Sequence, residues 1–552
     1  MNIMKRLKIK IALILIVLLG IGNFQIHAQI SQGGNAVSFL EKWEIPNPLI
    51  IMPSEQLINS SEVEKNCNAL EFGHFLPVNI SLGAKEWQIN ETSDGNLVYR
   101  LHIQSPNAKA VGAYFSDFNI PSGAKLFIYS PDQKQQIGAY TSFNNPSTGL
   151  FATEYITGAS LIIEYIEPKE VVGEGRFTLN QILHAYTGIP NFNNERGYGD
   201  SGECEVNVNC PEGDFKKKQR DAVVRLLIKS GENAFWCTGS LINNTAEDKT
   251  PYVITADHCG KDASIEDQDQ WIIFFNYQAE DCENPGIEPE HFSATGCREV
   301  ASSSNAGMLG SDFYLILLNS NIPESWQPYF LGWNRDGVGS NKGYSIHHPQ
   351  GDIKKISIYD SNLIESTYTG GMDLGFWRVT WTETLSGHGV TEGGSSGSPI
   401  FDDEGYIIGT LTGGQASCSA VNAPDFYGRL DMHWDQNGFN DDQRLKPWLD
   451  PLNTGVEKMN GVYLSIDDEE LAQNHLFSAL PNPVENNLVL SFDRNYSEFQ
   501  ITISDIQGRE VYNAHQKGNF SLDISLNTFN SGLYFVKVNS KDNTQVIKII
   551  KL

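Results

Sequence analysis

Residues 393–402 combine glycines, three serines and a proline in the order Gly-Gly-Ser-Ser-Gly-Ser-Pro-Ile-Phe-Asp. A serine hydroxyl attacks a carbonyl only when a base removes its proton and backbone N–H groups stabilise the oxyanion, and glycines let a loop curl inward to place those groups. Ser396 is the expected nucleophile, because the N–H groups of Gly394 and Ser396 can then converge on one oxyanion. Ser395 and Ser398 are expected to be structural. Taken alone, the loop also fits a plain Gly/Ser turn between strands.

Two residues upstream are candidate partners for this serine. His258 ends a short apolar strand beside a cysteine, and a His pinned there by a disulfide has the fixed ring position that a general base requires. Asp312 precedes another apolar run, where a buried carboxylate could accept the second ring N–H of His258. Asp257 is a rival, but a side chain adjacent to the His in a strand points to the opposite face. The chain order His, Asp, Ser is that of chymotrypsin-like double β-barrel proteases.

Further motifs extend this pattern over about residues 199–450. They are Gly-x-Ser-Gly-x-Cys-x-x-x-Val-x-Cys-Pro at 199–211, Thr-Ala-Asp-His-Cys at 255–259, His-His-Pro-Gln-Gly-Asp-x-Lys-Lys-Ile at 347–356, the serine loop at 393–399, and Asp-Phe-Tyr-Gly-Arg at 425–429. Together, in this order, they resemble the lysyl endopeptidase family of secreted bacterial trypsin-like serine proteases. The resemblance implies a chymotrypsin-like double β-barrel and a serine endopeptidase that cuts after basic residues.

The cysteines fit an exported chain. Eight cysteines in such a chain favour disulfides over metal or redox chemistry. Cys297 has no partner in the family scheme; it is left to pair with Cys67 or to compete with Cys210 for Cys282. The resemblance implies three disulfides: Cys204 with Cys418, Cys210 with Cys282, and Cys237 with Cys259.

The resemblance also implies where a substrate side chain would bind. Asp425 matches the position of the carboxylate that pairs with a substrate Lys or Arg, since a buried cation without a partner is very costly. The alternative for Asp425 is a solvated loop residue. Relatives with strict Lys preference carry a His where this chain has a Thr, so cleavage after Lys is expected, with Arg or mixed preference left open. The strand along which the substrate backbone would lie consists of Thr412, Gly413 and Gly414.

The first 198 residues precede the segment that resembles the protease. Residues 1–28 have basic residues, then an apolar run too short for a comfortable membrane span, then Ala28, which predicts a cleaved signal peptide. Residues 29–198 alternate apolar and polar positions between turns, which predicts a β-sandwich. Its position makes it a propeptide that keeps the enzyme silent or helps it fold, with a permanent accessory domain as the alternative.

The junction before residue 200 is polar and rich in glycine, hence exposed and cleavable. Cleavage after Arg196, or nearer Gly199, would release the mature protease. Chymotrypsin-like enzymes that insert a new amine need a carboxylate just before the nucleophile, and this chain has Ser395 there. Removal of a steric block is therefore the expected mode of activation.

The C-terminal part begins with an acidic linker at residues 451–474, whose charges are expected to be solvated. Residues 475–552 form a last β module. Its Asp505-x-x-Gly-Arg-x-Val, Ser531-Gly-Leu-Tyr-Phe and terminal Val-Ile-Lys-Ile-Ile-Lys resemble the C-terminal sorting domain of type IX secretion cargo. This implies transport across an outer membrane, followed by removal of the module or surface attachment. A carbohydrate-binding β-sandwich is the alternative.

The whole sequence thus predicts a mainly β protein, with a β-sandwich at 29–198, a double β-barrel at 199–450 and a small β-sandwich at 475–552. The formal net charge of −28 argues against nucleic-acid binding and favours cationic substrates. The mechanism needs no cofactor, and no His/Cys cluster has zinc spacing. We expect a secreted monomer without a membrane span that cuts proteins or peptides at basic residues. The type IX secretion machinery is its expected partner during export. Two alternatives are a silent protease-like surface binding protein and a protease of acidic specificity.

Overall fold

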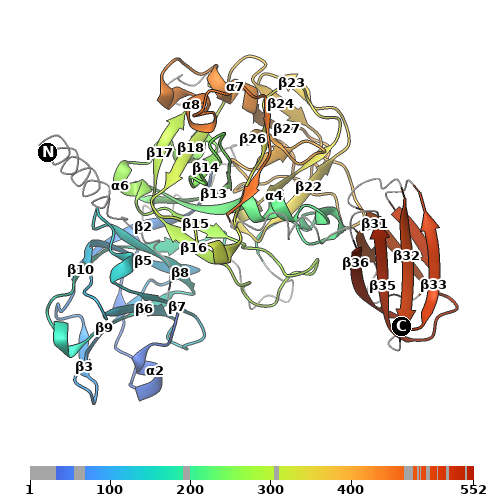
Figure 1. Cartoon of the computed structure of the whole chain (residues 1–552). Coiled ribbons are helices and arrows are strands. Elements are labelled where there is room, and N and C mark those ends of the chain that lie inside the picture. Colours follow the sequence, from blue (N-terminus) through green and yellow to red (C-terminus); the bar gives the residue numbers. More distant parts are fainter. Residues whose placement is uncertain are drawn as a thin grey trace, which may run out of the picture.

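The computed structural model describes residues 31, 33–54, 69–189, 199–303, 310–464, 477–480, 484, 486–492, 498–505, 508–517, 521–540 and 544–551. The chain is mainly β, and its strands form three regions that follow one another along the sequence (Figure 1). The expected signal peptide, Cys67, the Arg196 junction and residues 465–474 of the acidic linker lie outside the described residues, whereas residues 451–464 of that linker are described and contain two short strands. No helix within the described ranges is long and apolar enough to cross a membrane.

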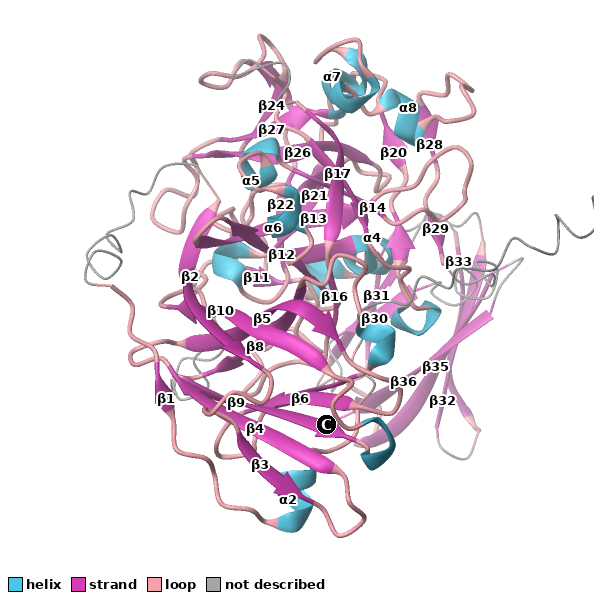
Figure 2. Cartoon of the chain, turned by 90° about the vertical axis from the view of Figure 1, so that its left-hand side faces the viewer, coloured by secondary structure: helices cyan, strands magenta, loops and turns pink. Residues whose placement is uncertain are grey.

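The N-terminal region is a β-sandwich, as the alternating pattern predicted. Apolar side chains from the inner faces of both layers, among them Ile103, Phe115 and Ile163, pack into one core, and Figure 2 shows the two layers one above the other. One layer contains β1 (Leu49–Ile50), β3 (Gln88–Glu91), β4 (Leu97–Gln104), β6 (Lys125–Tyr129), β7 (Gln136–Tyr140) and β9 (Ser160–Glu167). The other contains β2 (Leu70–Ser81), β5 (Ala110–Asn119), β8 (Phe151–Thr157) and β10 (Arg176–Ala185), and the short helix α2 (Val37–Glu41) precedes them all.

The first protease barrel continues directly from this second layer. Its strand β13 pairs antiparallel with β2, with Leu70 opposite Trp236, so the two regions share one eleven-stranded sheet. Short helices α4 (Lys217–Ala222), α5 (Asp257–Gly260) and α6 (Ile265–Gln268) lie between strands. The barrel strands are β12 (Val223–Ser230), β13 (Asn233–Leu241), β14 (Tyr252–Thr255), β15 (Ile272–Phe275), β16 (Phe292–Thr295), β17 (Cys297–Ser302) and β18 (Tyr314–Leu318).

The second barrel packs against the first and completes the chymotrypsin-like double β-barrel. Buried side chains from both barrels, such as Ile254 and Leu315 of the first and Trp333 and Phe401 of the second, share one core. The strands are β11 (Val206–Asn207), β20 (Trp333–Asn334), β21 (Gly343–His347), β22 (Lys355–Tyr359), β23 (Ile364–Ser366), β24 (Phe376–Val379), β25 (Pro399–Phe401), β26 (Ile407–Gly414), β27 (Asp425–Arg429) and β28 (Lys458–Met459). Strand β19 (Tyr329–Phe330) pairs with β29 (Val462–Tyr463), and α7 (Leu430–Asp435) and α8 (Lys446–Leu449) follow β27.

The C-terminal module is a small β-sandwich. Apolar residues at alternate positions, such as Leu488, Leu490, Ile501 and Ile503, form its core. One sheet contains β30 (Phe477–Leu480), β31 (Asn487–Phe492) and β34 (Ser521–Ser525). The other contains β32 (Phe499–Asp505), β33 (Glu510–Gln516), β35 (Gly532–Ser540) and β36 (Thr544–Lys551).

Candidate active site

The serine loop lies in a tight turn just before β25 and is held from both barrels. Gly394 and Gly397 have φ angles of 91° and 80°, which residues with a side chain rarely adopt. A Cβ at Gly397 would also lie 2.0 Å from the Thr255 hydroxyl. From β13, the Thr238 N–H donates to Ser396 O at 2.8 Å, and the Thr238 hydroxyl donates to Gly394 O at 2.9 Å. Glycine at positions 394 and 397 therefore lets the loop occupy a space in which a residue with a side chain would not fit.

Two amide groups of this loop are available to a ligand. Among the described residues, neither the N–H of Gly394 nor that of Ser396 donates a hydrogen bond. Buried backbone N–H groups are almost always paired. A pair of unpaired N–H groups two residues apart is the arrangement that an oxyanion requires.

His258 and Asp312 meet at the boundary between the barrels. Asp312 Oδ2 lies 2.8 Å from His258 Nδ1, and Asp312 Oδ1 accepts the His258 backbone N–H at 3.0 Å. Because the carboxylate only accepts, Nδ1 carries the proton. The other ring nitrogen, Nε2, is buried and has no hydrogen-bond partner in the part of the chain that the structure describes. That nitrogen is therefore free to accept a proton.

The sequence analysis expected His258 to end a strand, but it does not. Strand β14 stops at Thr255, and Asp257 starts the short helix α5, which contains His258. The argument that Asp257 points to the opposite face of a strand is therefore wrong in its premise, because a helical turn replaces the strand there. Even so, the carboxylate bonded to the His258 ring is that of Asp312.

A buried polar network that the sequence analysis missed holds Asp312 in place. Asp312 has a φ of 66°, a strained conformation for a residue with a side chain. The preceding Ser311 donates its N–H to Asn437 Oδ1 at 2.8 Å, and its hydroxyl lies 2.7 Å from His433 Nδ1. The other ring nitrogen of His433 lies 3.0 Å from the Thr410 hydroxyl. Burial lowers the pKa of His433 to about 3, so this support stays neutral.

The electrostatics of His258 and Asp312 favour an ion pair. Burial disfavours the charged form of His258, but the Asp312 carboxylate outweighs burial and raises the His258 pKa. Burial likewise works to raise the pKa of Asp312, yet the charge and hydrogen bonds of His258 lower it overall, with help from the Thr412 side chain. The imidazolium that forms when His258 takes a proton is therefore stabilised in place.

Asp425 lies on β27, buried below the end of β26. Its Oδ2 accepts hydrogen bonds from Trp381 Nε1 at 2.6 Å and from the Thr391 hydroxyl at 2.7 Å, and Oδ1 accepts the Ala416 N–H at 3.2 Å. Burial raises its pKa to about 6. Strand β26 runs antiparallel to β27, with Gly413 opposite Phe426 and Gly414 opposite Asp425. The structure thus brings Asp425, Thr412, Gly413 and Gly414 together at one edge of the second barrel.

The loop at 347–352 supports the serine loop from behind. His347 Nδ1 lies 2.9 Å from the Ser395 hydroxyl, and His348 Nδ1 lies 2.9 Å from the backbone oxygen of Asp352. The Gln350 N–H donates to Gly393 O at 2.6 Å. Among the described residues, no cluster of three or more His, Cys, Asp or Glu side chains is placed to hold a metal ion.

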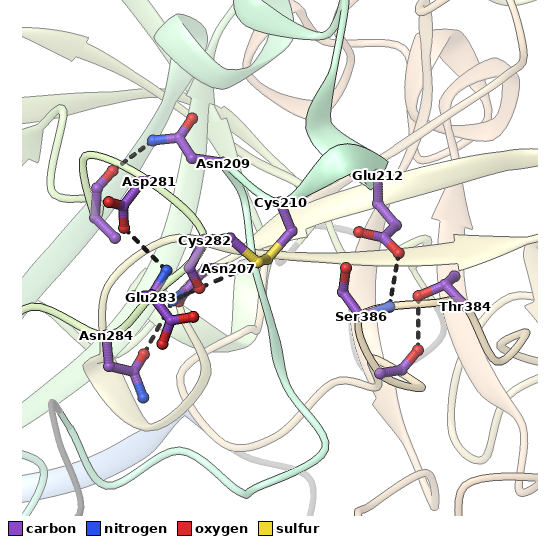
Figure 3. The surroundings of a disulfide bond; sticks show 12 residues. Asn207, Asn209, Cys210, Glu212, Asp281, Cys282, Glu283, Asn284, Thr384 and Ser386 are labelled. Carbon is purple, nitrogen blue, oxygen red and sulfur yellow. Dashed lines mark hydrogen bonds between the residues drawn. A yellow bond between two sulfur atoms is a disulfide. The ribbon is translucent and has the colours of Figure 1, made fainter. Parts of the chain in front are cut away.

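Three disulfides join the pairs that the resemblance implies: Cys204–Cys418, Cys210–Cys282 and Cys237–Cys259. The last one ties β13 to the helix that carries His258. Figure 3 shows the second, where Asn207 Nδ2 donates to Cys282 O at 2.8 Å and to Asn284 Oδ1 at 3.0 Å, so the start of the protease segment is fixed to a loop of the first barrel. Cys297 is a buried free thiol.

The N-terminal sandwich reaches this site through the start of β2. The pairing of Leu70 with Trp236 places β2 along β13, one residue before Cys237. A Cβ added to Gly393 would lie 3.3 Å from the Leu70 side chain, so Leu70 rests against the serine loop itself. Phe72 stacks on Trp236 with ring centroids 4.2 Å apart.

Two regions of the chain match known protein families. Residues 198–428 match the family model described as lysyl endopeptidase, C-terminal domain, and residues 478–552 match that of the secretion system C-terminal sorting domain. A lysyl endopeptidase of Pseudomonas aeruginosa is 26% identical over 358 residues, which cover 62% of this chain and 73% of that protein. The resemblance stated from the sequence motifs is thereby confirmed for both regions.

Two further matches are more distant. Secreted RxLR effector protein 73 of Plasmopara viticola is 25% identical over 367 residues, covering 60% of this chain and 81% of that protein. The crystal structure of the protease Anisep from Arthrobacter nicotinovorans is 15% identical and covers 38% of this chain and 90% of that one, with a TM-score of 0.27. The two family models and the lysyl endopeptidase relative identify a serine protease that is secreted or displayed at the cell surface.

Proposed function

We propose that this secreted serine protease is an endopeptidase that hydrolyses peptide bonds after basic residues, with Lys favoured. The observation that carries the proposal is His258, backed by Asp312 and beside the serine loop, because among the described residues its Nε2 and the N–H groups of Gly394 and Ser396 have no hydrogen-bond partner. In this scheme Ser396 is the nucleophile, His258 the general base, Asp312 the residue that orients it, and Gly394 and Ser396 the oxyanion donors.

The reaction proceeds by acyl transfer. Ser396 Oγ attacks the substrate carbonyl carbon while its proton passes to His258 Nε2, and the carbonyl oxygen becomes an oxyanion held by the two N–H groups. The C–N bond then breaks, and the leaving amine takes the proton from His258. Water repeats the sequence on the acyl-enzyme and releases the carboxylic acid and the free serine.

The geometry of Asp425 supports preference for Lys over Arg. Oδ2 already accepts two side-chain hydrogen bonds, from Trp381 and Thr391, whereas Oδ1 accepts the backbone N–H of Ala416 at the longer distance of 3.2 Å. One available oxygen suits the compact ammonium group of Lys. A guanidinium binds best with two parallel hydrogen bonds to both oxygens, which the occupied Oδ2 does not offer.

The test is cleavage of matched peptides that differ only in Lys, Arg or Glu before the scissile bond, by the fully processed protein. We expect the highest kcat/KM for Lys, a lower value for Arg and none for Glu. Ser396→Ala is the matched control for contaminating proteases and should abolish all cleavage. Preference for Glu, or cleavage that survives Ser396→Ala, would overturn the proposal.

We further propose that residues 29–198 are an inhibitory propeptide. Strand β2 supports this, because it adds to β13 where that strand passes the nucleophile and presses Leu70 against Gly393. A substrate bound with its basic side chain at Asp425 would extend beyond the scissile bond toward β13, and β2 occupies that edge. A permanent accessory domain would instead leave full activity in the uncut chain, so the activity of precursor and processed forms separates the two ideas.

The C-terminal module supports a proposal about the path of the protein. Residues 475–552 would be recognised by the type IX secretion machinery and then removed or used for surface attachment, while residues 199–450 form the catalytic domain. Deletion of residues 475–552 should leave the protease in the periplasm, as measured by cell fractionation with an antibody to the catalytic domain. Undiminished appearance in the medium would contradict this role.

A further inference from the structure

A buried carboxylate lies against the glycine that begins the protease segment. Asp352 is only 1% exposed, and a Cβ built on Gly199 would lie 2.0 Å from Asp352 Oδ2 and 2.1 Å from Oδ1. Gly199 also has a φ of 82°. Any other residue at position 199 would collide with the carboxylate, so the backbone of Gly199 lies directly against Asp352.

The Asp352 carboxylate is held mainly by hydrogen bonds. Its carboxylate accepts the Ser201 hydroxyl and the Ile353 N–H at 2.7 Å. Lys355 Nζ is 3.9 Å from Asp352 Oδ2 but donates to Asn207 Oδ1 at 2.7 Å. Lys355 is therefore a distant ion-pair partner of Asp352 whose hydrogen bond goes to Asn207.

Two more charged groups affect this carboxylate. Glu205 is a second buried acid, whose pKa burial raises well above its usual value, with Glu392 and Asp352 adding to the effect. Arg225 donates to Gly351 O at 2.8 Å and helps to hold the Asp352 pKa down, but burial dominates and raises it. A further cation at this place would stabilise the ionised carboxylate.

The position of Asp352 connects it to the oxyanion loop. It follows the turn η6 (Pro349–Gly351), and a Cβ at Gly394 would lie 2.9 Å from the Gly351 nitrogen and from the His348 oxygen. The Gln350 N–H in the same turn donates to Gly393 O. A cation bound to Asp352 would therefore stabilise the turn against which the oxyanion donors are placed.

We propose that the mature protease begins at Gly199 and that its new α-ammonium group pairs with Asp352, which makes Asp352 a positioning residue for the oxyanion loop. Hydrolysis of the 198–199 bond adds OH to the Tyr198 carbonyl carbon and H to the Gly199 nitrogen, and the resulting amine takes a proton from water. The neutral amide of Gly199 thus becomes a cation beside the Asp352 carboxylate, which can accept its hydrogen bond. The sequence analysis sought such an acceptor only at position 395, whereas this one lies on another loop.

The first test measures the amine directly. The N-terminal residue of the processed protein is identified by mass spectrometry, and its α-amine is reductively methylated with ¹³C-formaldehyde and titrated by NMR. We expect Gly199 at the terminus and an α-amine pKa raised above the ordinary value of about 8. Asp352→Asn should abolish the rise, and Asp200→Asn should keep it, because Asp200 bonds to Gly188 of the N-terminal region. A terminus at Gly197, or an unshifted pKa, would overturn the proposal.

The second test measures the effect on catalysis, and it rests on the proposed protease function. Carbamylation of the processed wild-type protein with cyanate near neutral pH removes the α-ammonium charge without changing a residue. We expect kcat to fall about tenfold, with KM little changed, and Asp352→Asn to be insensitive to the treatment. An unchanged kcat in carbamylated wild type would refute the role. Labelling of Ser396 by a fluorophosphonate in untreated protein separates this failure from absence of protease activity.

Discussion

Asp312 contacts His258 at two atoms, because Oδ2 lies 2.8 Å from the ring Nδ1 and Oδ1 accepts the backbone N–H at 3.0 Å. The carboxylate therefore fixes both the ring and the first turn of the helix that carries it. Ser311, His433 and Asn437 in turn hold Asp312 in its left-handed conformation. The orientation of the proposed general base thus depends on a chain of contacts that crosses both barrels.

Replacement of Asp312 by Asn should lower kcat by about 10⁴-fold, because an amide can stabilise the wrong ring tautomer and cannot stabilise the imidazolium. Steady-state kinetics on a Lys peptide would measure this. Asp257→Asn is the matched control, since Asp257 is adjacent in sequence but does not accept the ring N–H in the contacts seen here, and it should cost less than about tenfold. A larger loss for Asp257→Asn than for Asp312→Asn would reverse the assignment of the two carboxylates.

The pH dependence of kcat/KM should show an acidic limb above 6.5, the usual pKa of His. His258 must be neutral to accept the proton of Ser396, and the Asp312 carboxylate overcomes burial and raises its pKa. Activity is therefore lost as pH falls through this raised value. In Asp312→Asn the limb should move to lower pH. A limb that stays in place in the variant would exclude His258 as the titrating group.

Replacement of Asp425 by Asn should reduce kcat/KM for Lys peptides by about 10²- to 10³-fold, because the buried substrate cation loses its charge partner. The pKa of Asp425, raised to about 6 by burial, implies that wild-type KM for Lys peptides increases as pH falls below that value. Asp360→Asn, at an exposed position on the same barrel, is the control and should have no effect. Undiminished Lys cleavage by Asp425→Asn would place the specificity pocket elsewhere.

The contact between the N-terminal sandwich and the first barrel should depend on pH through Glu154 and His291. His291 Nε2 lies 2.8 Å from Glu154 Oε2, and Ser293 also donates to this carboxylate. Burial opposes the charge on His291, but Glu154, aided by Glu288, raises its pKa to about 9; this contribution is complete below its ordinary value and is lost as pH rises through 9. Burial works against ionised Glu154 too, but His291 and Arg225 lower its pKa, so its contribution is lost as pH falls through that lowered value.

The two parts should therefore separate more readily at about pH 10 than at about pH 7. Size-exclusion chromatography of Ser396→Ala protein, cut at the junction by an added protease, would measure their dissociation. Glu154→Gln should weaken the association at neutral pH and flatten its pH dependence. Equal retention of both fragments at all pH values would show that β2 and its apolar contacts alone determine docking.

Local sequence signals of two kinds were sufficient to predict the class of each region. Period-two alternation predicted the strands of the N-terminal and C-terminal sandwiches, and the order of the motifs predicted the double barrel, because both signals are local in the sequence. They did not predict that β2 joins β13, since a free strand edge carries no sequence mark of its partner. Nor did they predict that His258 lies in a helix, because the four residues of α5 are too few to show a helical period.

The sequence by itself determined which residues are chemically suited to act, namely Ser396, His258, Asp312 and Asp425, since nucleophile loops, bases and pocket carboxylates are carried by short motifs. Their catalytic roles remain predictions, although the structure brings the loops of Ser396, His258 and Asp312 to one boundary between the barrels. Only the tertiary structure decided what supports them: Leu70 against Gly393, His433 against Ser311, and Asp352 against Gly199. The physical reason is that each of these contacts joins residues more than a hundred positions apart, and its energy comes from burial and charge that exist only once the chain has folded.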